Sequence, residues 1–206
     1  MTATLSFQGS LLDIDAVPSF DPVFTGIRRH RLPAGAWVDR LPGWVAAADR
    51  LFVTALDALE WHEGTETIRG AAVARPRLVA SARRDRLPAG LEAIAEMSAA
   101  LSERYRVDLD RITCNLYRDG RDSVAWHGDR VARELPQATV AIVSLGEPRP
   151  FRLRPREGGS SISWPAGRGD LLVMGGSCQR TCEHSIPKVA HAGPRIAVMF
   201  RHAYDR

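Results

Sequence analysis

The 206-residue sequence predicts a mostly β protein with flanking helices, an α+β fold, on three observations. From residue 111 onward, short apolar or alternating runs are separated by Gly and Pro, which is typical of a sandwich or barrel of strands. Before residue 111, two segments carry an apolar stripe at helical spacing. No internal repeat or linker divides the chain, and its length suits one domain with a sizeable core.

The predicted strands lie in the second half of the chain, and turn sequences such as 156-REGGSS-161 and 167-GRGD-170 separate some of them. They are 111-RITCNLYR-118, 139-TVAIVSLG-146, 151-FRLR-154, 161-SISW-164, 170-DLLVMGG-176, 180-RTCEHSI-186 and 195-RIAVMFRH-202.

Two helices are predicted in the first half, which otherwise reads as irregular. One runs from about Pro42 to Trp61, and the other follows Pro88 as far as Tyr105. Their apolar stripes, which we expect to pack on the core, are Trp44, Ala48, Leu51, Ala55 and Leu59 in the first and Leu91, Ile94, Ala95, Leu101 and Tyr105 in the second. Between them, 75-RPRLVASARRDR-86 is expected to form an arginine-rich strand or loop.

Charge and cysteine content restrict the functional class. The formal charge is +4 and the sequence pI about 9.4, which permits a nucleic-acid partner without requiring one. Arginine clusters suit phosphate recognition, although they equally suit a solvated surface. Three cysteines, no basic apolar leader and no apolar run of membrane-spanning length indicate a cytoplasmic protein that does not cross a membrane. Cys178 and Cys182 lack the second cysteine pair of a typical zinc site.

The pair His127 and Asp129 is the first candidate for chemistry. Side chains two residues apart on an extended segment share a face, so both could reach one metal ion. His184, in another predicted strand, is the best-placed third ligand among the remaining histidines. Two histidines and one carboxylate leave coordination positions open and suit a non-haem ferrous ion that activates oxygen. The alternative is a polar loop beside an unrelated strand histidine.

Polar groups on two further predicted strands could serve the same site. Alternation in 195-RIAVMFR-201 puts the apolar Ile, Val and Phe on one face and both Arg195 and Arg201 on the other. Buried arginines require anionic partners, so one would bind an organic acid while the other lies nearer the metal. Asn115 and Tyr117 lie on the polar face of 111-RITCNLYR-118, where they would orient a small ligand or face solvent.

These motifs, in this order, resemble the AlkB family of Fe(II)/2-oxoglutarate-dependent dioxygenases. The segment 115-NLYRDGRDSVAWHGD-129 is similar to the family's N-x-Y…H-x-D block, in the wording of the animal-type homologues, as expected for a bacterial member of that subgroup. The resemblance continues through 143-VSLGEPRPF-151, 174-MGGSCQRTCEH-184 and 195-RIAVMFR-201 and covers approximately 75–202.

The resemblance implies a double-stranded β-helix, a jelly-roll barrel backed by helices, in a single 2-oxoglutarate/Fe(II) dioxygenase domain spanning 1–206. About 1–110 would be an N-terminal helical extension with a nucleotide-recognition lid, and about 111–206 the jelly-roll catalytic core.

The resemblance also implies a role for each candidate residue. His127, Asp129 and His184 would bind Fe(II). Arg195, assisted by Tyr117, would pair with the far carboxylate of the cosubstrate 2-oxoglutarate. Asn115 would contact the metal-chelating end of 2-oxoglutarate, and Arg201 would position its other carboxylate and Asp129. Together with O₂, this set would oxidatively demethylate N-alkylated bases of the 1-methyladenine or 3-methylcytosine type in single-stranded DNA or RNA, a repair of alkylation damage by a monomeric enzyme.

Two departures from the family pattern concern the pocket. Ala197 and Met199 stand where the final strand of the family usually has Asn and Thr, and 76-PRLVASARRDRLPAG-90 has no aromatic residue to stack on a flipped base. Two alternatives therefore stay open: an oxygenase of the same fold with a different substrate, or a catalytically retired nucleic-acid-binding module.

Overall fold

The computed structural model describes residues 7, 9, 16–68, 71–129, 131 and 135–202. Its strands are β1 (Ser19–Phe20), β2 (Arg28–Arg31), β3 (Trp37–Leu41), β4 (Val45–Ala46), β5 (His62–Ile68), β6 (Ala71–Arg83), β7 (Arg111–Tyr117), β8 (Val124–His127), β9 (Val140–Gly146), β10 (Arg149–Pro155), β11 (Ile162–Ala166), β12 (Asp170–Gly175), β13 (Cys182–Ile186) and β14 (Arg195–Arg201). The α-helices are α1 (Ala48–Ala58), α2 (Glu92–Tyr105) and α3 (Cys178–Thr181), with short 3₁₀ turns at Pro33–Gly35 and Arg84–Arg86.

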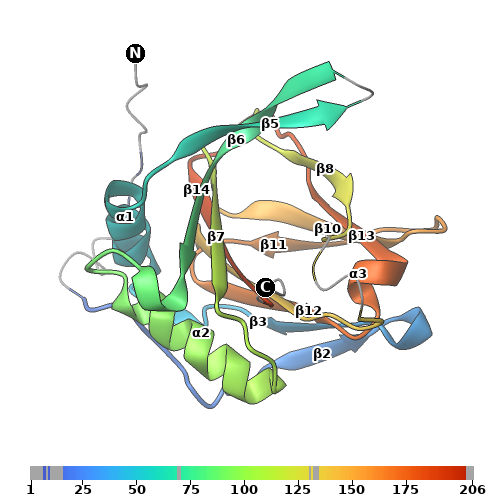
Figure 1. Ribbon diagram of the computed structural model, residues 1–206, viewed down its shortest axis with the longest axis horizontal. Helices are drawn as coiled ribbons and strands as arrows, with labels where there is room; N and C mark the ends of the chain where they lie inside the picture. Colours follow the sequence, from blue (N-terminus) through green and yellow to red (C-terminus); the bar gives the residue numbers. More distant parts are fainter. Residues whose placement is uncertain are drawn as a thin grey trace.

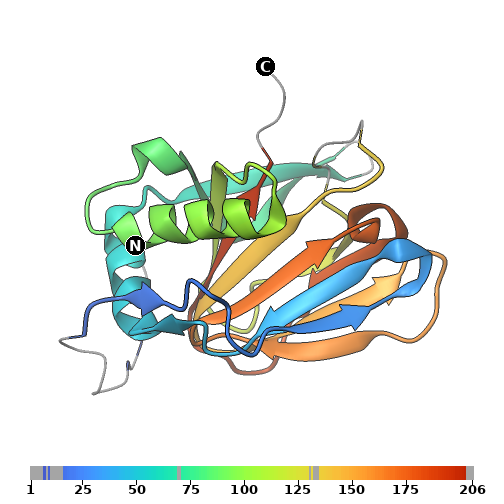
Figure 2. The same ribbon diagram turned by 90° about the horizontal axis from the view of Figure 1, so that it is seen from below.

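Two antiparallel sheets form the body of the described structure (Figure 1). The larger has eight strands in the order β2-β3-β12-β9-β14-β7-β6-β5, and the smaller has four in the order β11-β10-β13-β8. Figures 1 and 2 show α1 and α2 on the side of the molecule away from β10, β11 and β13. The mostly β fold with flanking helices is therefore confirmed.

Alternation along the central strands separates two apolar clusters. On β14, Ile196, Val198 and Phe200 pack in the cluster that contains the buried faces of α1 and α2. Ala197 and Met199 pack instead in the cluster between the two sheets. This division was predicted from the period-two pattern, and it directs the ends of β14 toward the space between the sheets.

Strand register sets the positions of the polar side chains. β14 pairs with β7 so that Arg195 lies opposite Tyr117 and Ala197 opposite Asn115. In the smaller sheet, His184 of β13 lies opposite His127 of β8. Residues almost sixty positions apart in the sequence are thus brought side by side by backbone pairing.

The first half of the chain contains more strands than the sequence pattern predicted. β2, β3 and β5 extend the large sheet on both sides of the central strands, in place of an irregular segment. β6 also joins this sheet, which bears out the strand alternative for the arginine-rich segment 75–86 as far as Arg83. All four residues of β2 are exposed, so they lack the apolar alternation that marks a strand. β6 includes Pro76, which is unusual inside a strand, and that residue further obscured the pattern.

Both predicted helices form, with shorter bounds. The first begins at Ala48 and not near Pro42, because Val45 and Ala46 pair with β1 and Ala47 takes a left-handed backbone conformation (φ 50°). None of the helices in the described part of the chain has the length and apolar character that a bilayer crossing needs.

Candidate active site

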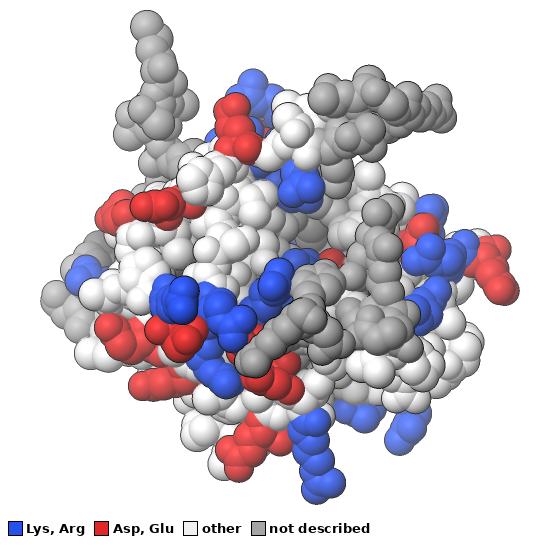
Figure 3. Space-filling view, viewed as in Figure 1, with Lys and Arg blue, Asp and Glu red and all other residues white. Residues whose placement is uncertain are grey.

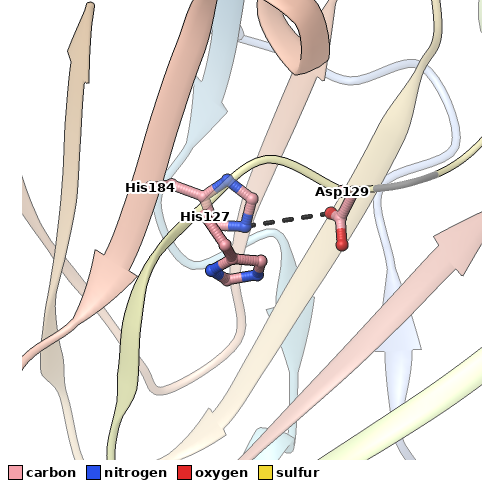
Figure 4. A group of neighbouring side chains, drawn as sticks. All are labelled: His127, Asp129 and His184. Carbon is pink, nitrogen blue, oxygen red and sulfur yellow. Dashed lines mark ion pairs between the residues drawn. The ribbon is translucent and has the colours of Figure 1, made fainter. Parts of the chain in front are cut away.

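His127, Asp129 and His184 converge at one point between the sheets (Figure 4). His127 is the last residue of β8, Asp129 follows it by two positions, and His184 lies in the middle of β13. One potential ligand atom from each of the three lies within 4.8 Å of the others, and the two imidazole centroids are 4.3 Å apart. This spacing suits coordination of a single ion by all three side chains.

The loop between the first two ligands is held in a close-packed conformation. Gly128 has no room for a side chain, because an added Cβ would lie 2.7 Å from Nη2 of Arg156 and 2.9 Å from the carbonyl oxygen of Gln179. The backbone amide of Asp129 donates a hydrogen bond to Oε1 of Gln179 at 2.9 Å. The glycine in H-G-D therefore allows α3 and the side chain of Arg156, just after β10, to pack against this loop.

One carboxylate oxygen of Asp129 is occupied and the other is available. Nη2 of Arg201 donates to Oδ1 at 2.8 Å. The buried Oδ2 finds no hydrogen-bond partner among the described residues and lies 3.8 Å from Nε2 of His184. Burial favours a higher pKa for Asp129, but the charge of Arg201 and the two histidines together outweigh it and keep that pKa below its usual value. Asp129 is thus ionised, with one oxygen available to a metal ion.

Both histidines are prepared to act as neutral ligands. The Nδ1 atom of His127 lies 2.9 Å from the carbonyl oxygen of Ala125, so a proton on Nδ1 leaves Nε2 free to coordinate. Burial lowers the pKa of His184 to about 3, so its imidazole is uncharged at neutral pH. The ring of Phe151 stacks on His184 with a centroid distance of 5.4 Å. An unpaired carboxylate oxygen and two neutral imidazoles fit a ferrous ion with open coordination positions.

Arg195 supplies a buried positive charge near these residues. It is 1% exposed, its Nε donates to the carbonyl oxygen of Ala166 at 3.0 Å, and its Nη2 donates to Oγ of Ser144 at 2.7 Å. Its Nη1 is buried without a hydrogen-bond partner among the described residues. Because these partners are neutral, the guanidinium still lacks an anion, and a carboxylate would provide one.

A cavity of about 180 Å³ joins the two parts of the site. All seven residues predicted for the site line it: Asn115, Tyr117, His127, Asp129, His184, Arg195 and Arg201. The guanidinium of Arg195 lies 5.2 Å from the centre of the Tyr117 ring, and the side-chain amide of Asn115 contacts the sulfur of Met199 at 3.8 Å. Met199 thus occupies space beside Asn115 in the cavity.

Sequence reasoning did not identify four further residues at this site. Arg75, Arg77 and Val79 of β6 line the same cavity, as the period-two spacing in 75-RPRLV-79 could have indicated. Arg149 is 1% exposed and donates to the carbonyl oxygens of Asp119, Asp122 and Pro187 at 2.7–2.9 Å. Its guanidinium lies 5.8 Å from the Tyr117 ring, so Arg149 joins two loops beside the end of the cavity that Tyr117 lines.

The other metal-binding possibilities raised by the sequence are not assembled. His30 packs near Trp164, and His202 accepts a hydrogen bond from the amide of Thr139. Cys178 and Cys182 are free and buried. Among the described residues, only His127, Asp129 and His184 form a group that could hold a metal ion.

Comparison with known proteins identifies the family. The family model described as "2OG-Fe(II) oxygenase superfamily" matches residues 46–201. The chain belongs to this superfamily. Two solved structures share its fold at low sequence identity: "The structure of OsALKBH1" (TM-score 0.53, 13% identity, 85% of this chain and 100% of that one) and a Trichoplax adhaerens prolyl hydroxylase in complex with a hypoxia inducible factor peptide fragment (TM-score 0.59, 14% identity, 85% and 82%). The predicted jelly roll is therefore confirmed.

The predicted resemblance to AlkB proteins is also confirmed. The chain is 31% identical over 127 residues to the mouse "Alpha-ketoglutarate-dependent dioxygenase alkB homolog 3", which covers 57% of this chain and 44% of that protein. It is 35% identical over 103 residues to the human homologue, a match that covers 45% of this chain and 36% of the human protein. It is also 35% identical over 111 residues to the Arabidopsis thaliana "DNA oxidative demethylase ALKBH2", a match that covers 42% of this chain and 35% of that protein. The similarity spans less than half the length of each of these relatives.

Metal binding is testable through thermal stability, with Mn²⁺ as an oxygen-stable probe. At one hundred times its dissociation constant, a ligand stabilises the folded state by about 2.7 kcal/mol, so we expect Mn²⁺ to raise the Tm of the wild type by about 5–10 °C. Asp129→Asn removes the free anionic oxygen and should abolish most of this rise, whereas Asp57→Asn on the exposed face of α1 should retain it. An equal Mn²⁺-induced rise in both variants would contradict the assignment.

Proposed function

We propose that this chain is an active oxidative demethylase that acts on N-alkylated bases, of the 1-methyladenine or 3-methylcytosine type, in single-stranded DNA or RNA. The observation that carries the proposal is the joint presence, in one cavity, of an intact two-histidine, one-carboxylate set and a buried guanidinium without an anion. The names of the matched relatives, a DNA oxidative demethylase among them, support the reaction class. A monomer acting in the cytoplasm is part of the same proposal.

The division of roles follows from the positions of the side chains. His127, Asp129 and His184 would hold Fe(II), and Arg195 would receive the far carboxylate of 2-oxoglutarate. When held there, Fe(II), 2-oxoglutarate and O₂ would supply the oxidising power for hydroxylation of an N-methyl carbon, with succinate and CO₂ as coproducts and formaldehyde as the group released.

The protein's own contribution is to orient these groups and to keep water out. Arg201 fixes one oxygen of Asp129, so the other points toward the metal position. Tyr117 is 2% exposed and lies beside Arg195, which is 1% exposed, so both side chains are shielded from bulk solvent at this end of the cavity. Salt bridges in such surroundings are stronger than in water, because the local dielectric constant is low.

The substrate side of the cavity is formed by β6, which we propose as part of the nucleotide-recognition lid. Arg75 and Arg77 point from β6 into the cavity that His127 also lines. A guanidinium can stack its plane on a base or bind a phosphate through its edge, so these arginines could replace the aromatic residue that segment 76–90 lacks. The described part of this segment contains no aromatic ring.

The surface charge pattern suggests local and not long-range attraction of nucleic acid. Figure 3 shows Lys and Arg side chains interspersed with Asp and Glu across the visible face. Ion pairs such as Arg83–Asp110 and Arg168–Glu147 neutralise several of the arginines. Binding would then rely on the few cations at the cavity itself.

The proposed reaction is tested with single-stranded DNA, RNA and tRNA carrying 1-methyladenine or 3-methylcytosine. We expect Fe(II)-loaded wild type to produce succinate and formaldehyde in matched amounts, and His127→Ala to lose roughly 100-fold or more of both, since even residues that only support a metal ligand contribute 10–100-fold. Succinate without demethylation would leave an oxygenase with a different substrate. Absence of turnover together with intact oligonucleotide binding would favour a retired binding module.

The role of β6 is tested through Arg77→Ala. Loss of one phosphate-binding or stacking cation should weaken binding of a methylated single strand about fivefold. If Arg77 contacts a phosphate, its loss should also reduce the slope of log K against log salt concentration by about one. The KM for 2-oxoglutarate should be unchanged. Arg121→Ala is the matched control, because the Arg121 side chain is 89% exposed outside the cavity. Equal binding by Arg77→Ala and wild type would refute this assignment.

A further inference from the structure

The strand that carries His127 is weakly held by its backbone. β8 has four residues and lies at the edge of the smaller sheet, with β13 as its neighbour. Its pairing with β13 is interrupted, because His184 lies opposite His127 and Ile186 opposite Val124, with a register shift between them. A short, bulged edge strand is prone to fraying, yet here it must place an imidazole within coordination distance of another.

On the outer face of the smaller sheet, the residue before each histidine contacts the same arginine side chain. Trp126 immediately precedes His127, and Glu183 immediately precedes His184. The guanidinium carbon of Arg154, on β10, lies 4.2 Å from the centre of the Trp126 ring. Its Nη2 and Nε donate to Oε2 of Glu183 at 2.9 and 3.3 Å.

The strand order makes this contact a bridge across three strands. β13 lies between β10 and β8, so the side chain of Arg154 passes over β13 to reach the tryptophan on β8. A guanidinium can satisfy both partners at once, since its edge binds the carboxylate while its face covers the ring. The side chains of Arg154 and Glu183 are 37% and 21% exposed, so solvent only partly screens the pair.

We propose that Arg154, Trp126 and Glu183 form an outer clamp, with Arg154 as a positioning residue that sets the distance between His127 and His184. The clamp acts on the metal affinity of the folded protein through the edge strand, and not through overall stability. The inference rests on the metal centre proposed above, and it adds residues outside the cavity that have no contact with cosubstrate or base.

The test is calorimetric titration with Mn²⁺ in the presence of 2-oxoglutarate. Arg154→Gln should weaken Mn²⁺ binding about tenfold, in the range found when residues supporting a metal ligand are removed. Arg154→Lys keeps the charge but loses the planar guanidinium, so the Mn²⁺ affinity of this variant should lie between that of wild type and that of Arg154→Gln. Arg152→Gln is the matched control, because Arg152 is exposed on the same face of β10, two residues away, opposite Ser185. It should bind within about twofold of wild type.

A double-mutant cycle tests whether the clamp acts as a unit. Trp126→Leu should weaken Mn²⁺ binding by a factor similar to that of Arg154→Gln. The double variant should bind Mn²⁺ with the affinity of the weaker-binding single variant, because both substitutions remove the same interaction. Hydrogen exchange should accelerate at residues 124–127 in Arg154→Gln while β7 and β14 keep wild-type protection. That pattern separates a local effect on the ligand strand from general destabilisation.

The outcomes distinguish failure of the clamp from failure of the metal centre. Wild-type Mn²⁺ affinity in Arg154→Gln, a loss no larger than that of Arg152→Gln, additive effects in the cycle, or uniformly faster exchange would overturn the clamp and leave the metal centre intact. If wild type and His127→Ala bind Mn²⁺ equally poorly, the metal centre is refuted and the clamp with it.

Discussion

An arginine at each end of β14 points into the space between the two sheets, and the cost of burying these charges governs the chemistry of the site. Arg201 is neutralised by Asp129 within the protein. Arg195 is held by a carbonyl and a hydroxyl oxygen, which carry no net charge, and one of its nitrogens is left without a partner in the described structure. The charge of Arg201 is therefore balanced within the protein, whereas that of Arg195 still lacks an anion. A dicarboxylic acid that chelates the metal at one end and reaches Arg195 with the other satisfies both requirements.

The sequence was most informative where a strand has one apolar and one polar face. Alternation in β7 and β14 correctly predicted which side chains pack under the helices and which line the cavity. The two-residue spacing of His127 and Asp129 predicted a shared direction, but the position of His184 relative to them depends on the pairing of β8 with β13. β2 was not predicted because it is exposed throughout, and the proline in β6 left a strand and a loop equally open for that segment. Arg149 was missed for a different reason: its partners are backbone carbonyls, which leave no trace in a side-chain pattern.

The two sides of the cavity differ in how strongly they are determined. On the metal side, the ligands are fixed by Arg201 and Gln179, by Gly128, whose lack of a side chain admits its neighbours, and by the outer clamp. On the proposed substrate side, β6 presents Arg75 and Arg77, and segment 76–90 has no aromatic residue. In the function proposed above, the metal-side contacts determine the class of reaction, and the side chains of β6 determine the substrate. Substitutions in β6 can therefore alter the substrate without disturbing the metal centre, because no metal ligand comes from that strand.

The central claim is that one metal ion and one dicarboxylate share this cavity. A crystal structure of the protein with Mn²⁺ and 2-oxoglutarate tests it most directly. We expect Mn²⁺ to be coordinated by Nε2 of His127, Oδ2 of Asp129 and Nε2 of His184, with the far carboxylate of 2-oxoglutarate on Nη1 of Arg195. A metal ion bound elsewhere, or a dicarboxylate that leaves Nη1 of Arg195 without a partner, would contradict the account.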